Sequence, residues 1–259
     1  MKTSHYLFLL FFISGCSSAY IPSPKNVPLL EKKGEIQIEA GASTNSIFAT
    51  GSYAFSEKYA LITNGSMSFQ NILQSLYLDS GGGGVDSYYL PIGFSDVAHH
   101  SVEAGIGRYN FLPFSDRRLE LFAGAGYGGA HTLSEHDKVS NFQCFMQVNT
   151  GKRHRRFEQG WSLRTAISGF HYQHGYYKSQ FDENGNYTGN RLIIEHGNYQ
   201  ALHLEPLLVI RTGGQRLKVS FRTAFNLAFP LSSPSGIKTF GIDRGYTVLH
   251  FSVGMNYRF

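Results

Sequence analysis

The chain has 259 residues, with 23 Lys and Arg against 18 Asp and Glu, and a formal net charge of +5. Its 29 Gly, 21 Phe and 16 Tyr favour strands joined by glycine-containing turns. The interior of the sequence has no run apolar enough for a membrane helix. The composition therefore excludes a helical membrane protein and leaves strands as the only elements that could cross a bilayer.

The first residues predict an export signal. An apolar run over residues 6–13 follows a basic residue and is too short for a stop-transfer helix. The tetrad "ISGC" at 13–16 resembles the lipobox of bacterial lipoproteins, which implies cleavage before Cys16 and acylation of that residue. We expect a signal peptide over residues 1–15 and a lipid anchor at Cys16. Cleavage at a nearby site without acylation is the alternative.

Residues 16–34 are expected to form a lipid-anchored tether. The stretch "SSAYIPSPKNVPLLEKKG" has three Pro and no periodicity, which suits an extended connection. Acylation of Cys16 would leave Cys144 alone, so no disulfide could form within the chain. The folded part is expected to cover residues 35–259.

Ten segments of this folded part look like strands, and several have apolar residues at every second position. The pattern is clear at 217–229 and in the closing stretch "VLHFSVGMNYRF", where one face is apolar and the other polar. The predicted strands are 35–43, 46–55, 59–69, 98–109, 119–130, 139–150, 156–172, 198–211, 216–229 and 247–259.

The connections between these segments alternate in length, except that the link at 43–45 is short where a longer one is expected. Consecutive turns of antiparallel strands lie at opposite ends, so the alternation predicts one end with tight turns and one with large loops. The short connections are 56–58, 113–118, 150–156 and 212–215, and the longer ones are 70–97, 131–138, 173–197 and 230–246.

Together these features resemble the small outer-membrane β-barrels of Gram-negative bacteria, in particular those with a lipoprotein signal. The resemblance covers residues 35–259, and its most specific mark is the ending "FSVGMNYRF". It implies that Phe259 and Tyr257 form the signal read by the barrel-assembly machinery. It also implies one all-β, antiparallel up-and-down transmembrane barrel with short periplasmic turns and long extracellular loops. About ten strands are expected, with eight or twelve as alternatives, and the N-terminal anchor would lie on the periplasmic side.

If the apolar side chains face lipid, the polar files place charged residues of both signs inside the barrel. Buried charges must pair or hydrate, so an ion-pair network that plugs the lumen is expected. A narrow channel for small solutes is the alternative. The predicted network consists of Glu39, Glu103, Glu120, Arg164, Glu205, Lys218, Arg222 and Arg258.

The outer loops hold weak candidates for chemistry. His131, His136, His171 and His174 could supply metal ligands, but their spacing matches no known ligand motif, so we predict no metal and no other cofactor. Ser134, Glu135 and His136 have the residue types of a rim hydrolase, although adjacent residues rarely supply the geometry of a nucleophile, base and acid. The glycine-rich stretch 79–87 lacks the Lys-Ser/Thr pair of a phosphate-binding loop.

We therefore expect a binding or structural protein and no enzyme, one that presents surface loops or serves as an accessory subunit of an envelope complex. Its partners would be membrane lipids and other envelope proteins. The basic residues are concentrated in the tight turns without a nucleic-acid-binding motif, so no nucleic-acid partner is expected. A different setting is a soluble, lipocalin-like barrel with its apolar residues turned inward.

Overall fold

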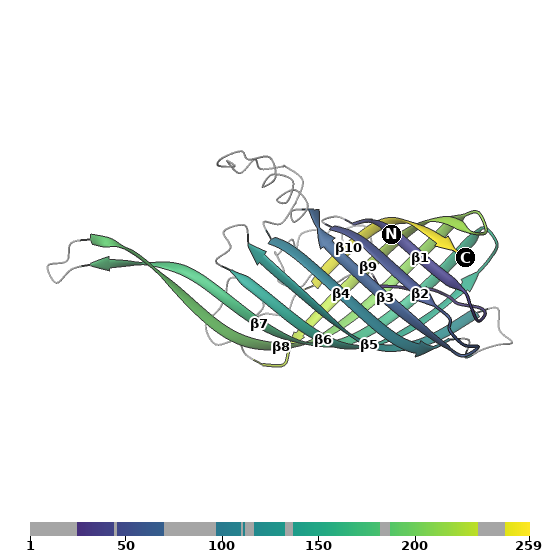
Figure 1. Cartoon of the computed structure of the whole chain (residues 1–259), viewed down its shortest axis with the longest axis horizontal. Coiled ribbons are helices and arrows are strands. Elements are labelled where there is room, and N and C mark those ends of the chain that lie inside the picture. Colours follow the sequence, from purple (N-terminus) through teal and green to yellow (C-terminus); the bar gives the residue numbers. More distant parts are fainter. Residues whose placement is uncertain are drawn as a thin grey trace, which may run out of the picture.

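The computed structural model describes residues 25–43, 46–69, 97–109, 111, 117–132, 137–181, 187–232 and 247–259. Over these residues the chain forms ten strands, and the last strand pairs with the first, so the antiparallel sheet closes into a barrel (Figure 1). Among the residues described, no helix has the length and apolar character needed to cross a membrane. The strands are β1 (Ile36–Ser43), β2 (Ser46–Tyr53), β3 (Tyr59–Ser68), β4 (Val97–Arg108), β5 (Arg117–Thr132), β6 (Lys138–Arg153), β7 (Phe157–Phe181), β8 (Tyr187–Gly213), β9 (Leu217–Pro230) and β10 (Thr247–Arg258).

The predicted ten-stranded up-and-down barrel is confirmed. The observed strands agree with the predicted segments to within a few residues, except at the outer ends of β7 and β8. The closing stretch forms β10, which pairs with β9 on one side and with β1 on the other. This strand therefore closes the barrel and leaves no unpaired edge in the sheet.

Side chains alternate between the outside and the lumen along each strand. On β7 the alternation is unbroken from Phe157 to Tyr172. Trp161 and Ile167 point outward and are 52% and 55% exposed, whereas Arg164 points inward and is fully buried. The lipocalin-like alternative is therefore wrong, because the large apolar side chains form an outer band and the charged ones lie inside.

The prediction of a loop over 173–197 was wrong. β7 and β8 continue as a two-stranded ribbon beyond the barrel wall, where they pair only with each other among the described strands. β6 pairs with β7 only as far as Gln173, and β9 pairs with β8 only as far as Ala201. The ribbon projects far to the left in Figure 1, opposite the end at which β10 finishes. Because neither of its faces is fully buried, it does not need the strict apolar alternation that identified the other strands.

Residues 25–30 lie inside the barrel, whereas the predicted tether would run outside it. All six are buried. The chain then reaches the end with the tight turns, where the amide of Gly34 donates to the carbonyl of Ala54, and continues into β1. The described part of the predicted tether is thus packed with the barrel. A short, non-periodic stretch with Pro gives no sequence signal for burial, since its contacts are all with distant residues. Residues 16–24 lie outside the described part of the chain.

Candidate functional site

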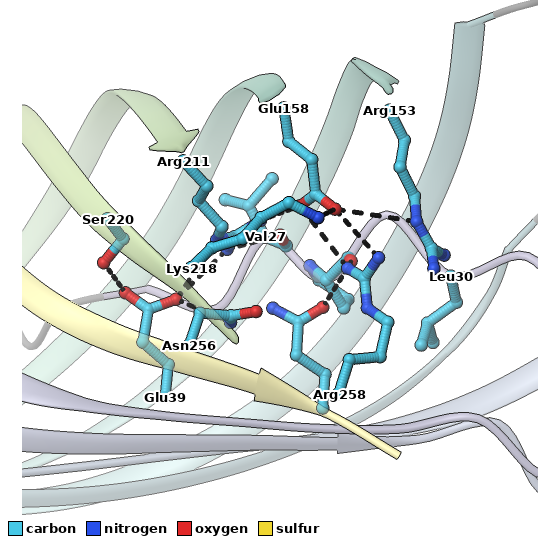
Figure 2. A network of polar contacts seen from close by, with 12 residues as sticks. Val27, Leu30, Glu39, Arg153, Glu158, Arg211, Lys218, Ser220, Asn256 and Arg258 are labelled. Atoms are coloured by element: carbon cyan, nitrogen blue, oxygen red, sulfur yellow. Dashed lines mark hydrogen bonds and ion pairs between the residues drawn. The ribbon is translucent and has the colours of Figure 1, made fainter. Parts of the chain in front are cut away.

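The lumen contains two groups of charges, which are buried except for the partly exposed Arg153. The rim cluster lies near the end with the tight turns, and Figure 2 shows part of it; the mid cluster lies deeper in the barrel. The rim cluster consists of Glu35, Glu39, Arg153, Glu158, Arg211, Lys218, Arg222 and Arg258. The mid cluster consists of Lys25, Glu103, Arg164 and Glu205.

The carboxylate of Glu158 is the centre of the rim cluster. Its oxygens lie 2.9 Å from the Lys218 ammonium, 2.9 Å from Nη1 of Arg258 and 3.3 Å from Nη1 of Arg211 (Figure 2). These side chains come from β7, β8, β9 and β10, so the contacts join four strands across the lumen. Such a network holds the register of the barrel at its inner end.

Glu39 on β1 is the second anchor of the rim cluster. It pairs with Arg222 at 2.5 Å and with Arg211 at 3.2 Å, and it accepts a hydrogen bond from the hydroxyl of Ser220. All of these groups are buried. The charges therefore compensate one another in a space from which bulk water is excluded.

In the mid cluster, Arg164 binds Glu103 through two parallel hydrogen bonds of 2.7 and 2.9 Å. This fork geometry is the strong form of an Arg–carboxylate pair. The guanidinium also lies 3.9 Å from the ring centre of Phe145. Glu205 lies 3.4 Å from Nε of Arg164 and 3.0 Å from the ammonium of Lys25. Residues 25–30, called the buried segment below, therefore contribute one of the four charges of this cluster, that of Lys25.

Lumen side chains bind the main chain of the buried segment residue by residue. Carbonyl oxygens accept hydrogen bonds at four successive positions, and the amide of Leu30 donates to the carboxylate of Glu120 at 2.7 Å. The donors to the carbonyls of residues 25, 26, 27 and 28 are Arg222, Gln147, Arg211 and Arg258, at 2.8, 2.7, 2.9 and 3.0 Å. A non-helical, non-strand backbone is thereby satisfied inside the barrel.

The apolar side chains of the segment fill two hydrophobic pockets in the lumen. Val27 and Leu29 pack with Val209 and neighbouring residues, and Leu30 packs with Phe122 and others in a second group. Leu29 has a φ of 53°, in the left-handed region, which costs a non-glycine residue about 1–3 kcal/mol. Burial of each apolar side chain contributes about 1.5–3 kcal/mol, so the packing offsets the backbone strain.

The charge balance of the lumen depends on this segment. In the rim cluster three carboxylates face five cations, and the segment's carbonyl oxygens accept hydrogen bonds from three of those five, Arg211, Arg222 and Arg258. In the mid cluster, Glu103 and Glu205 are balanced only when Lys25 is counted with Arg164. Without the segment the mid cluster would carry excess negative charge, and three cations of the rim cluster would each lose a hydrogen-bond acceptor.

The structure places all eight residues of the predicted lumen network inside the barrel, buried to 5% exposure or less. Seven of them take part in the two clusters. Glu120 differs, because it binds the amides of Asn149 and Leu30 and no ion pair is recorded for it among the described residues. Sequence reasoning missed Glu158 and Arg211, although both lie in the same alternating files as Arg164 and Glu205 and could have been found there. Lys25 had no such signal.

Two of the predicted His residues, His171 and His174, each have a partner near the outer mouth. Nδ1 of His174 lies 2.6 Å from the carboxylate of Asp137, which is an arrangement of a base and an orienting acid. The hydroxyl of Tyr176 donates to Glu195 at 3.1 Å, and this bond raises the pKa of Tyr176. His171 stacks on the ring of His196.

The candidate metal ligands do not converge. His171 and His174 lie on opposite faces of β7, because side chains three positions apart alternate. Among the residues described, no group of three or more His, Cys, Asp or Glu could hold a metal ion. His136 and Ser134, the latter proposed as a hydrolase nucleophile, lie outside those residues.

The ribbon has two different faces. Tyr177 lies opposite Leu192, and Gly175 lies opposite Ile194, on the face that continues the lipid-facing side of the barrel. Farther out, Phe181 pairs with Tyr187 on β8, and their rings meet edge to face. The other face carries Lys178 opposite Arg191, and also Tyr176 opposite Ile193. Tyr177, Leu192 and Ile194 are 59%, 36% and 48% exposed.

A polar collar separates this apolar face from the membrane band. On the outer side of β7 and β8, His171 and His196 stack, and His171 is hydrogen-bonded to Asn198. The apolar residues of the ribbon therefore lie beyond the level at which the barrel wall meets the lipid headgroups.

The inner end of the barrel carries an exposed aromatic belt, typical of a membrane interface. Phe259 is 65% exposed, its amide donates to Ile36, and its ring packs on Tyr257. Tyr53, Phe55, Tyr59 and Phe157 are also exposed. The proposed assembly signal is thus placed at the bilayer edge, while Cys16 lies outside the described residues.

No model of a known family matches the sequence, and no curated protein matches it. Among solved structures, the outer membrane protease OmpT from Escherichia coli is 10% identical, with a TM-score of 0.41 over 87% of this chain and 93% of that chain. The N-terminal β-barrel domain of Pseudomonas aeruginosa OprF is 7% identical, with a TM-score of 0.32 over 88% and 98%. A major outer membrane protein from Thermus thermophilus is 10% identical, with a TM-score of 0.25 over 87% and 98%. Sequence identities and TM-scores as low as these support no inference about activity.

The barrel itself defines the class of the protein. A closed antiparallel sheet with an apolar outer band, an aromatic belt and a charged lumen is the architecture of the outer-membrane β-barrel proteins of Gram-negative bacteria.

Proposed function

We propose that this protein is an outer-membrane lipoprotein whose barrel is a closed scaffold that presents the β7–β8 ribbon for binding at the cell surface. The observation that carries the proposal is the occupied lumen. Residues 25–30 and the two charge clusters, apart from Arg153, are buried, which argues against solute passage. The filled lumen does not conduct, and the described residues assemble no catalytic site. The functional surface of this barrel is therefore on its exterior.

Conductance distinguishes the closed scaffold from the narrow channel. Wild-type protein in planar bilayers should give no single-channel steps. A variant lacking residues 20–31 should conduct, because the deletion removes the main chain that fills the lumen and leaves unbalanced charges that attract water. Heat-modifiable migration on gels would confirm that each barrel is folded. Steady wild-type currents equal to those of the deletion variant would overturn the proposal and favour the channel.

The binding role is tested on the ribbon. Tyr176 and Tyr177 are adjacent but point to opposite faces, which makes them a matched pair for a photo-crosslinking amino acid. We expect adducts with another envelope protein from position 177 in intact cells and few from position 176. Equal labelling from both positions, or none from either, would contradict a binding role for the apolar face. Recognition by the barrel-assembly machinery through Phe259 belongs to the same proposal.

Hydrolysis at the outer mouth is a second candidate function. One contact favours it, the 2.6 Å pair of Asp137 and His174. A fluorophosphonate probe should label the wild-type protein and fail to label His174→Ala if a nearby serine is activated. Absence of labelling in the wild type would remove serine-type hydrolysis from consideration.

A further inference from the structure

Residues 25–34 run along the lumen between the mid cluster and the tight-turn end. Gly34 lies at the tight-turn end, where it is bonded to Ala54, and Glu31 pairs with Arg118 close to that end. Going back along the sequence, the chain passes the rim cluster and reaches Lys25, whose ammonium binds Glu205 in the mid cluster. On β8, Glu205 is eight positions from Gly213 at the inner end and four from Ala201, the last residue paired with β9 (213 − 205 and 205 − 201). Traced toward its N-terminus, the chain therefore moves away from the tight-turn end.

A return to the tight-turn end would need a second pass through the rim cluster. That layer is already filled by the segment and by side chains such as Glu39, Arg211 and Lys218, all 4% exposed or less. An eight-stranded barrel is just filled by its own side chains, and ten strands add little width. A second main chain would also have to displace ion pairs that compensate one another, which costs several kcal/mol for each charge left alone.

The outer mouth is within reach of the upstream chain. Gln147 on β6 binds the carbonyl of Asn26, and β6 ends nine positions farther out at Lys138 (147 − 138). Nine strand residues tilted by about 40° span about 23 Å along the barrel axis. Cys16 is also nine positions from Lys25 (25 − 16), and an extended chain of that length covers at most about 30 Å.

We propose that the polypeptide threads the barrel, so that the chain preceding Lys25 leaves through the outer mouth and the mature N-terminus is displayed at the cell surface. The lumen clusters then act as a binding site for a single extended peptide of this chain. If Cys16 is acylated, as its lipobox suggests, its acyl chains would enter the outer leaflet. The anchor expected on the periplasmic side would instead lie on the opposite side. The inference goes beyond the binding role of the ribbon and does not depend on it.

Thiol labelling tests the threading. Cys144 is exposed on the barrel wall, so the background is Cys144→Ser. Three variants that each add one cysteine to this background are compared in whole cells with a membrane-impermeant maleimide, and the background alone reports any labelling of Cys16. They are Ser18→Cys upstream of the lumen, Ser179→Cys on the ribbon as the outer control, and Glu57→Cys in a tight turn as the inner control. Mass spectrometry verifies that residue 18 is retained, and heat-modifiable migration verifies folding.

We expect Ser18→Cys and Ser179→Cys to be labelled in intact cells, and Glu57→Cys only after the outer membrane is permeabilised. Labelling of Ser18→Cys only after permeabilisation, or only after denaturation, would overturn the threading. The outer control reports barrel orientation in either case, and a wild-type channel current would contradict the closed scaffold without changing the labelling result.

Discussion

Replacement of Glu158 by Gln tests whether the lumen charges hold the barrel together. Four cations pair with this carboxylate, but three of them keep another partner. Arg258 retains Glu35 at 3.1 Å, Arg211 retains Glu39 at 3.2 Å, and Arg153 retains Glu35 at 2.7 Å. For Lys218, no other carboxylate contact is recorded among the described residues. The change therefore leaves one buried cation uncompensated, and we expect a loss of about 3–5 kcal/mol in the free energy of unfolding, as for one broken buried pair.

The assay is urea unfolding of the barrel from lipid vesicles. The single tryptophan, Trp161, faces lipid, so its emission should shift as it enters water. Glu57→Gln in an exposed turn is the control and should change stability by less than about 0.5 kcal/mol. The double variant Glu158→Gln with Lys218→Met should recover most of the loss, because it removes the unpaired cation. A single variant within about 1 kcal/mol of wild type, or a double variant no better than the single one, would refute the reasoning.

Three further outcomes are expected in the same assay. Leu30→Ala should lower the free energy of unfolding by about 2–5 kcal/mol through loss of apolar packing in the lumen, whereas Leu231→Ala at an exposed position should have little effect. Gly160→Ala should be destabilising, since a Cβ there would lie 3.0 Å from side-chain carbons of both Val27 and Val209; unchanged stability would argue against a tightly held segment. Shortening the ribbon by removing residues 176–192 should leave barrel stability unchanged, because that part pairs only with itself among the described strands; a large loss would show that it supports the barrel.

The alternation of apolar and polar residues determined the barrel. It predicted about ten strands, and it required all of them to turn their apolar faces to one common side. The same alternation assigned Arg164, Lys218 and Arg222 to the lumen, since a position in a strand fixes the face on which its side chain lies.

The tertiary structure alone decided what fills the barrel and how far the ribbon extends. Lys25 pairs with Glu205, 180 positions away in the sequence, and Arg211 donates a hydrogen bond to the carbonyl of Val27, 184 positions away. No local sequence pattern could predict either contact. The ribbon, likewise, is held by backbone pairing rather than by burial, and pairing leaves no mark in residue periodicity. Sequence periodicity reports the environment of a face, whereas the partner that occupies a closed space is set by shape and charge assembled from distant strands.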